Sequence, residues 1–285
     1  MSLKKSFKPA FLFLSIVYSL LSMVCLASAQ EWKEAKGDHF ILYYASEDAH
    51  PKEVIRKAEF YYNRIAEDLG YARYSNFWQW DKRVKIYIHP SQQAFQDATG
   101  QPAWSHGMAS YLDKTIHSIQ TNPNFMDSIL PHEITHLIFR DFIGLKGQAP
   151  LWMDEGVAQW EEDAKRKEAL AVMPDLVARG DAFTLDTLMT LDIRQDADAH
   201  RVGLFYTQSI SLIDFLIRTF GPAGFTEFCR GLRDGKPLVA ALRAAYPNSL
   251  TSVEEMDDRW RKYLHVQKAA TIAEEEPSQT TVLKS

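Results

Sequence analysis

Two histidines and a glutamate lie close together in the segment LPHEITHLIF, which runs from Leu130 to Phe139. On an α-helix, residues four apart project from nearly the same face, so His132 and His136 can bind one metal ion. Glu133 is shifted around the helix, where it can hydrogen-bond a water molecule at the metal without binding the metal itself. The pattern therefore indicates a zinc site with two imidazole ligands and a general base.

A catalytic zinc ion needs a third protein ligand and one open position for water. Metzincin peptidases place a glycine and a third histidine soon after this motif, but Phe139 and Phe142 occupy those positions here. The other solution is a carboxylate on a following helix, and the segment WMDEG from Trp152 to Gly156 supplies one. Glu155 in this segment follows His136 after an interval of 18 residues.

The motif HEITH, this interval and the sequence LWMDEGVAQW resemble the gluzincin zinc metallopeptidases. They are most similar to peptidase MA-like domains, which are related to the catalytic domains of aminopeptidase N-type enzymes. In that family W-x-x-E-G-x-A carries the third zinc ligand, so the resemblance implies that Glu155 has this role and that each chain binds one Zn²⁺. The resemblance extends loosely over residues 38–265, and it implies a thermolysin-like catalytic domain.

Two acidic residues near Glu155 are candidates for orienting the histidines, because metal-bound histidines usually donate their other N–H group to a carboxylate or carbonyl. Glu162 lies two helical turns after Glu155 on the same predicted face, and a carboxylate at that offset resembles the aminopeptidase pattern. The alternative for Glu162 is a surface charge in the run EED. Asp154 is the weaker candidate, since we expect it to point away from the metal.

A metallopeptidase also needs a group that stabilises the oxyanion, and Tyr or His commonly does this in gluzincins. Tyr206 and His200 are the candidates here, and the resemblance favours Tyr206. The alternative is that Tyr206 packs in the core with Ile210 and Ile213, which share its helix face. The remaining histidines show no ligand spacing and are interpreted as structural or surface residues: His39, His50, His89, His106, His117 and His265.

The elements that must position these residues follow from apolar periodicity. Residues 30–125 predict a small α/β lobe with a mixed sheet, and residues 126–267 predict a helical lobe that carries the zinc site, so the fold class is α+β. The predicted strands of the first lobe are 39–44, 83–89, 107–111 and 115–120, and its helices are 52–69 and 91–99. The predicted helices of the second lobe run through the motif to 144, and over 151–170, 203–219, 225–232, 238–246 and 252–266.

Proline at position 131, directly before the first histidine, predicts that the motif helix begins within one turn of His132. At the other end of the chain, residues 268–285 are polar and include three consecutive glutamates. This composition is typical of a disordered tail.

The first 29 residues have the layout of a secretory signal peptide: lysines, then an uncharged run from Phe11, then the small-residue site Ala27–Ala29. They predict an exported protein, either periplasmic or secreted; an uncleaved membrane anchor is the alternative. Cleavage after Ala29 removes Cys25 and leaves Cys229 alone, so no internal disulfide can form. Cys229 lies in an apolar helical pattern and is interpreted as a buried structural thiol.

Composition limits the class of protein. With 285 residues and 46% hydrophobic content the chain can bury a sizeable core, and its net charge of −5 shows no basic patch for a nucleic acid. The sequence therefore predicts an exported zinc metallopeptidase that hydrolyses a peptide or protein substrate. The alternatives are a gluzincin-fold binding module that holds zinc without cutting, and a helical protein in which the motif is coincidental.

An extended peptide substrate would pair with an exposed sheet edge, and residues 115–120 are the predicted edge strand. Aminopeptidases of the resembled family carry a G-x-M-E-N stretch that holds the substrate's amino terminus. This chain has only Gly107–Ser110, GMAS, without the glutamate. An endopeptidase is therefore favoured over an aminopeptidase.

Overall fold

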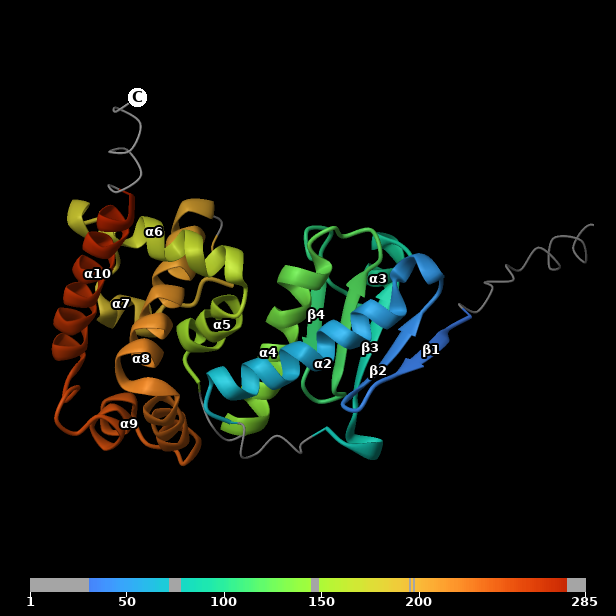
Figure 1. Cartoon of the computed structure of the whole chain (residues 1–285), viewed down its shortest axis with the longest axis horizontal. Coiled ribbons are helices and arrows are strands. Elements are labelled where there is room, and N and C mark those ends of the chain that lie inside the picture. Colours follow the sequence, from blue (N-terminus) through green and yellow to red (C-terminus); the bar gives the residue numbers. More distant parts are fainter. Residues whose placement is uncertain (1–30, 72–77, 145–148, 195, 197, 276–285) are drawn as a thin grey trace, which may run out of the picture. The chain divides into compact units, whose positions relative to one another are not determined.

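A computed structural model of the chain describes residues 31–71, 78–144, 149–194, 196 and 198–275 (Figure 1). The expected signal peptide, with Cys25, and the last ten residues of the expected tail lie outside this part. The helices and strands given below all lie within Lys33–Ser285, which forms one unit. In the described part, no helix combines the length and the apolar character needed to cross a membrane.

The first half of this unit is built on a five-stranded sheet, and the prediction of a small mixed sheet is confirmed, with one strand more than the four predicted. Its strands are β1 (Lys33–Lys36), β2 (Phe40–Tyr44), β3 (Val84–His89), β4 (Gly107–Ser110) and β5 (Thr115–Ile119), in the order β1-β2-β3-β5-β4. The three central strands are parallel, and β1 and β4 are antiparallel to their neighbours. The sequence did not predict β1, because its KEAK residues show no apolar alternation.

The prediction that residues 115–120 form the exposed edge strand is wrong. β5 pairs on one side with β3 and on the other with β4, and its residue Ile116 is fully buried. On this side of the sheet the edge strand is β4, which pairs only with β5 among the described strands; β1 forms the opposite edge. The sequence of a hairpin does not reveal which of its two strands pairs with the rest of the sheet. Here the second strand, β5, pairs with β3, and the first strand, β4, pairs only with β5.

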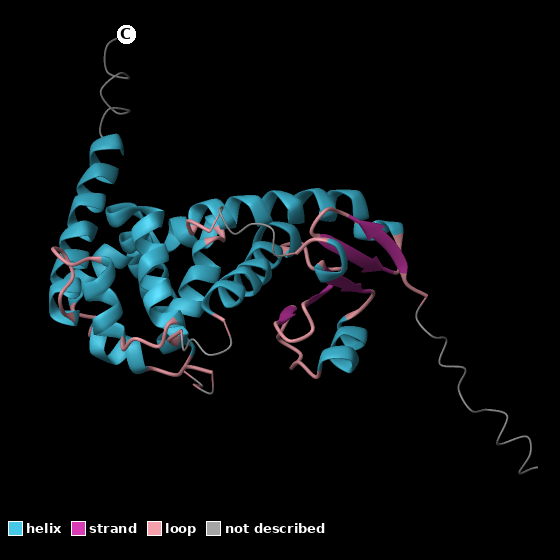
Figure 2. Cartoon of the chain, turned by 90° about the horizontal axis from the view of Figure 1, so that it is seen from below, coloured by secondary structure: helices cyan, strands magenta, loops and turns pink. Residues whose placement is uncertain are grey.

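Three helices belong to the sheet half: α2 (Pro51–Asp68), α3 (Gln92–Thr99) and α4 (Leu130–Ile143). α2 begins with Pro51 and directs Val54, Ala58 and Ile65 inward, and it packs against β2 and α4. α4 contacts α2 and β4 on one side and α5 and α8 on the other (Figures 1 and 2). The helix that carries the motif thus lies at the junction of the sheet and the remaining helices.

The second half is helical and consists of α5 (Leu151–Trp160), α6 (Asp163–Arg179), α7 (Leu185–Thr190), α8 (Ala199–Arg233), α9 (Leu238–Ala245) and α10 (Val253–Glu275). The predicted helical lobe begins at residue 126 and so also includes α4. α8 joins two predicted helices across a kink at Gly221, whose φ of 77° is accessible to glycine without strain. α10 continues to Glu275, so the beginning of the expected tail is helical.

The single helix predicted over 151–170 is instead two helices, because the chain turns at Glu161 and Glu162. Glu162 has an extended backbone, with φ −87° and ψ 97°, and forms the N-cap position of α6. Arg64 of α2 stabilises the turn, since its guanidinium donates to the backbone oxygen of Glu161 at 2.6 Å and to the side chain of Glu161 at 3.0 Å. A contact between residues 97 positions apart has no signature in the local sequence.

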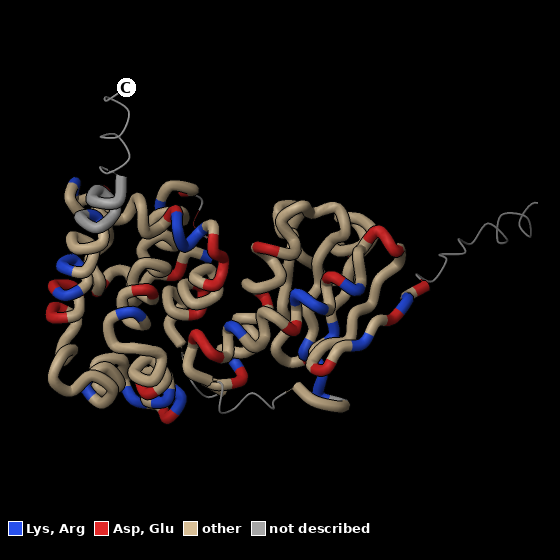
Figure 3. Tube along the Cα trace, viewed as in Figure 1, with Lys and Arg blue, Asp and Glu red and all other residues tan. Residues whose placement is uncertain are grey.

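Buried apolar side chains of both halves form one continuous core. Cys229 is fully buried in it, as predicted for a structural thiol. Three of the histidines interpreted as structural or surface residues are partly or fully buried: His39 contacts Glu59 at 2.6 Å, and His89 contacts His117 at 3.0 Å. Acidic and basic residues are interspersed along the described trace (Figure 3).

Candidate metal centre

The motif helix α4 begins at Leu130, within one turn of His132, which confirms the prediction from Pro131. A π-helical turn from Phe125 to Ile129 leads into it, and the N–H of Leu130 bonds to the carbonyl of Phe125. Proline is tolerated in the first helical turn because its missing N–H group would have no intrahelical partner there. Both histidines therefore project from the first two turns of α4.

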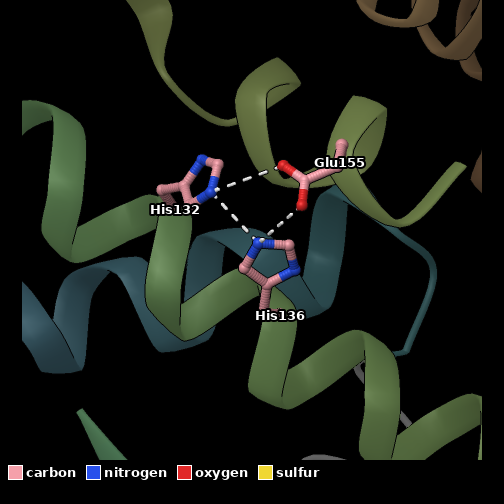
Figure 4. Close-up of side chains that lie close together, drawn as sticks. All are labelled: His132, His136 and Glu155. Atoms are coloured by element: carbon pink, nitrogen blue, oxygen red, sulfur yellow. Dashed lines mark hydrogen bonds and ion pairs between the residues drawn. The ribbon is translucent and has the colours of Figure 1, made fainter. Parts of the chain in front are cut away.

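The structure brings the three predicted metal ligands together (Figure 4). The Nε2 atoms of His132 and His136 are 3.0 Å apart. The Glu155 carboxylate lies 3.9 Å from the first and 4.0 Å from the second of these nitrogens. Ligand atoms around a tetrahedral zinc ion with bonds of about 2.0–2.1 Å are separated by roughly 3.3 Å. The two nitrogens are thus slightly closer than this, and each lies within 4.0 Å of one of the two Glu155 oxygens, so the three residues can close on a single ion after shifts of less than about 1 Å.

Each histidine is held through its other nitrogen by a buried carboxylate. His132 Nδ1 lies 2.9 Å from Glu162, and His136 Nδ1 lies 3.3 Å from Asp154. These contacts favour the tautomer in which Nδ1–H donates and the Nε2 lone pair is free for a metal. The expectation that Asp154 points away is wrong: it binds both His136 and Arg140 of α4.

Glu162 contacts His132, but not because it shares a helix face with Glu155, as the sequence suggested. The helical periodicity from Glu155 is interrupted by the turn between α5 and α6, and this turn directs the carboxylate back toward α4. Only 1% of the residue is exposed. Its oxygens accept hydrogen bonds from Ser128 and, at 2.8 Å, from Lys165. The alternative reading of Glu162 as a surface charge is therefore wrong.

Replacing Glu162 by alanine is expected to lower the affinity for zinc by about 10- to 100-fold, the usual effect of removing such a partner. His132 then loses the acceptor that fixes its ring. Competition with a fluorescent chelator measures the change, and Glu168→Ala on the exposed side of α6 is the matched control. Unchanged affinity in Glu162→Ala would show that the contact does not orient the ligand.

The charges around the three ligands favour a cation. Burial by itself lowers the pKa of His136, but the hydrogen bond and charge of Asp154 and the charge of Glu155 outweigh it and raise this pKa to about 9. Burial likewise raises the pKa of Asp154, and the contacts with His136 and Arg140 overcome it and hold this pKa at about 2. The carboxylates around the imidazoles therefore favour positive charge at this site.

Glu133, the predicted base, is buried between α4 and the edge strand β4. Burial raises its pKa above the ordinary value, although a backbone hydrogen bond from Ala109 acts in the opposite direction. The strand comes so close that a Cβ atom at Gly107 would lie 2.8 Å from Glu133 Oε1 and 2.4 Å from a side-chain atom of Ile129. Glycine at this position lets the edge strand run directly past the base.

Tyr206 reaches the site from α8. It is partly buried, and burial together with the charge of Glu155 raises its pKa to about 12, so that it remains a hydrogen-bond donor at neutral pH. Gly156 permits the close packing of α5 on α8, because a Cβ atom there would meet the backbone oxygen of Ser209 at 3.1 Å. His200, the other oxyanion candidate, is exposed at the beginning of α8 and does not line the site.

A cavity of about 290 Å³ is lined by Glu133, by Tyr206 and by two of the three candidate ligands, His132 and Glu155. Sequence reasoning missed several of its lining residues, which come from the segment before β4, from the π-helical turn and from the ends of α5 and α6. They are Trp104, Ser105, Ser128, Ile129, Gln159 and Lys165, and His106, assigned above to the surface, lines it too. Most of these residues carry no sequence signal that relates them to the motif, because they approach it only in the folded chain. Trp104 and His106 are the exception, since they directly precede the edge strand β4.

The sequence model of the peptidase MA superfamily matches residues 72–266, which is more than half of the chain and includes the cavity and its ligands. A search of curated proteins finds no significant match.

Proposed function

Because the chain belongs to the peptidase MA superfamily, we propose that it is a zinc metallopeptidase in which His132, His136 and Glu155 bind the ion. The observation that carries the proposal is the convergence of two imidazole nitrogens and one carboxylate on a single space that one ion can occupy. The buried carboxylates behind the two imidazoles support it, since they prepare both Nε2 atoms for a metal.

Bound Zn²⁺ would supply Lewis acidity, which makes a water molecule more acidic and polarises the scissile carbonyl. The protein contributes the proton transfers. We assign Glu133 as the general base that takes a proton from the attacking water and then returns it to the leaving amine. Its burial suits this role, because burial raises the pKa of the carboxyl above its ordinary value and so makes the carboxylate a stronger base.

We assign Tyr206 to stabilise the oxyanion, since its hydroxyl lines the cavity as a protonated donor. Tyr206→Phe is expected to lower kcat by about 100-fold, with little change in KM and in bound zinc. Steady-state kinetics and elemental analysis measure these quantities, and His200→Ala is the matched control on the same helix. A tyrosine that only packs in the core would leave kcat within a few-fold of the wild type.

The substrate is proposed to be a peptide or protein segment that pairs in extended form with β4, the edge strand beside Glu133. The four residues Gly107–Ser110 contribute no carboxylate that could bind a free amino terminus. We therefore propose an endopeptidase rather than an aminopeptidase. The signal-like residues 1–29 support the further proposal that the enzyme is exported.

Metal content and cleavage profiling of the purified chain test the proposed function together. We expect about one equivalent of zinc and cleavage of peptides that are blocked at both ends, identified by mass spectrometry. Less than about a tenth of an equivalent of zinc would contradict the metal site. Full zinc without cleavage of any peptide would instead support a binding module, and cleavage confined to free amino termini would support an aminopeptidase.

A further inference from the structure

Trp104 is one of the most exposed large apolar side chains in the described part of the protein, with 80% of its surface accessible. It lies three residues before the edge strand β4. Its indole lines the same cavity as Glu133 and Glu155. A single exposed tryptophan is ordinary on a protein surface, but one at the wall of a site that holds a base and three metal ligands is placed to contact a substrate.

The segment that carries Trp104 is held firmly on both sides of it. The N–H of Ser105 donates to the carbonyl of Pro102 at 2.9 Å, and the amide of Gln92 donates to the carbonyl of Ser105 at the same distance. Farther along, Ser118 of β5 donates to the carbonyl of His106 at 2.7 Å. The backbone around Trp104 is thus fixed while its side chain stays in water, so a ligand that contacts the indole has to order this side chain but not the chain segment that carries it.

The remaining cavity wall indicates what the indole would recognise. Among the described residues that line the cavity, Lys165 is the only lysine or arginine. Its ammonium group pairs with Glu162 at 2.8 Å, which weakens its attraction for an acidic substrate. The apolar surface comes from Trp104 and from Ile129, beside the edge strand. An aromatic ring or a large aliphatic side chain can pack on an indole face, and such contacts add to the burial of apolar area.

We propose that Trp104 is a specificity-determining residue that selects a large apolar or aromatic side chain beside the scissile bond of a peptide extended along β4. This inference rests on the proposed peptidase function, since it assigns the substrate class of the same site. Trp104 is assigned no role in proton transfer or in binding zinc.

The test uses the zinc-loaded full chain and a set of peptides, blocked at both ends, that differ only in one central residue: Phe, Leu, Ala or Glu. Binding is measured by calorimetry in the Glu133→Gln background, so that it does not depend on turnover, and cleavage is measured with Glu133 intact. Trp104→Ala and Trp104→Phe are compared with Trp80→Ala. Trp80 is the matched control because it is 82% exposed and lies outside this cavity.

We expect the Phe and Leu peptides to bind about ten-fold more tightly than the Ala peptide. Trp104→Ala should abolish this preference, Trp104→Phe should retain part of it, and Trp80→Ala should match the parent. Equal profiles for Trp104→Ala and Trp80→Ala, or a preference for the Glu peptide, would overturn the inference.

These outcomes separate the inference from the proposed function. Trp104-dependent binding of the apolar peptides without any cleavage would support the inference and contradict the peptidase. Cleavage whose peptide preference is the same in Trp104→Ala and the parent would support the peptidase and contradict the inference. If no peptide is bound or cleaved, both are contradicted.

Discussion

Glu133→Gln is expected to keep its full equivalent of zinc and to lower kcat by about 10²- to 10⁴-fold, the range for loss of a general base. Glutamine has the shape of glutamate but cannot accept a proton from water. The substitution should disturb the structure little, because an amide oxygen can still accept the backbone hydrogen bond from Ala109. Removal of a buried carboxylate should leave the melting temperature unchanged or slightly higher.

Three measurements on the same preparation check this prediction: zinc by elemental analysis, hydrolysis of a blocked peptide, and thermal unfolding. Glu168→Gln, an exposed position on α6, provides the matched control and should behave as the wild type. Hydrolysis in Glu133→Gln within ten-fold of the wild type would show that another group takes the proton. Loss of zinc along with activity would mean that the side chain is needed for the metal rather than for the reaction.

Glu155→Ala is expected to retain less than about a tenth of an equivalent of zinc after dialysis and to show no measurable hydrolysis. The substitution leaves two imidazoles as protein ligands and removes a negative charge next to His136. Asp154 cannot take its place without giving up His136 and Arg140, which it already binds. In the wild type, by contrast, added zinc should raise the melting temperature, because the ion binds the folded state.

Elemental analysis and thermal unfolding with and without zinc give the readouts for this second variant, and Glu168→Ala is the control. Folding of the metal-free variant should be intact, since Glu155 is partly exposed at the cavity and is not part of the apolar core. A full equivalent of zinc in Glu155→Ala would place the ion elsewhere. A zinc-dependent thermal shift equal to that of the wild type would lead to the same conclusion.

Local pattern was sufficient for most of the fold. The strand at β3 follows from the alternation of Val84, Ile86 and Ile88, and Ser91 caps α3 as predicted, accepting a hydrogen bond from the N–H of Ala94. These features depend on residues within one or two turns of each other, so they can be read along the chain. The break between α5 and α6 depends on Arg64, far away in α2, and local periodicity therefore extended the helix past it.

Pairing order in the sheet was also beyond local reasoning. The sequence predicts both strands of the hairpin from Gly107 to Ile119. The order of apolar and polar residues in them does not show which strand lies at the edge of the sheet and which lies inside it. Packing decides between them: β5 pairs with β3, and β4 is left as the edge beside α4. This difference moves the proposed substrate strand from β5 to β4 and places Trp104 next to it.

The sequence by itself determined two of the candidate metal ligands, because the spacing of His132 and His136 on one helix makes them neighbours wherever that helix packs. The resemblance to gluzincins added Glu155. Only the tertiary structure decided what holds and surrounds these residues: Asp154 and Glu162 behind the imidazoles, Tyr206 from α8, and the edge strand beside Glu133. Ligand spacing is a property of a single helix, whereas supporting contacts form between segments that the chain brings together only when the core is packed.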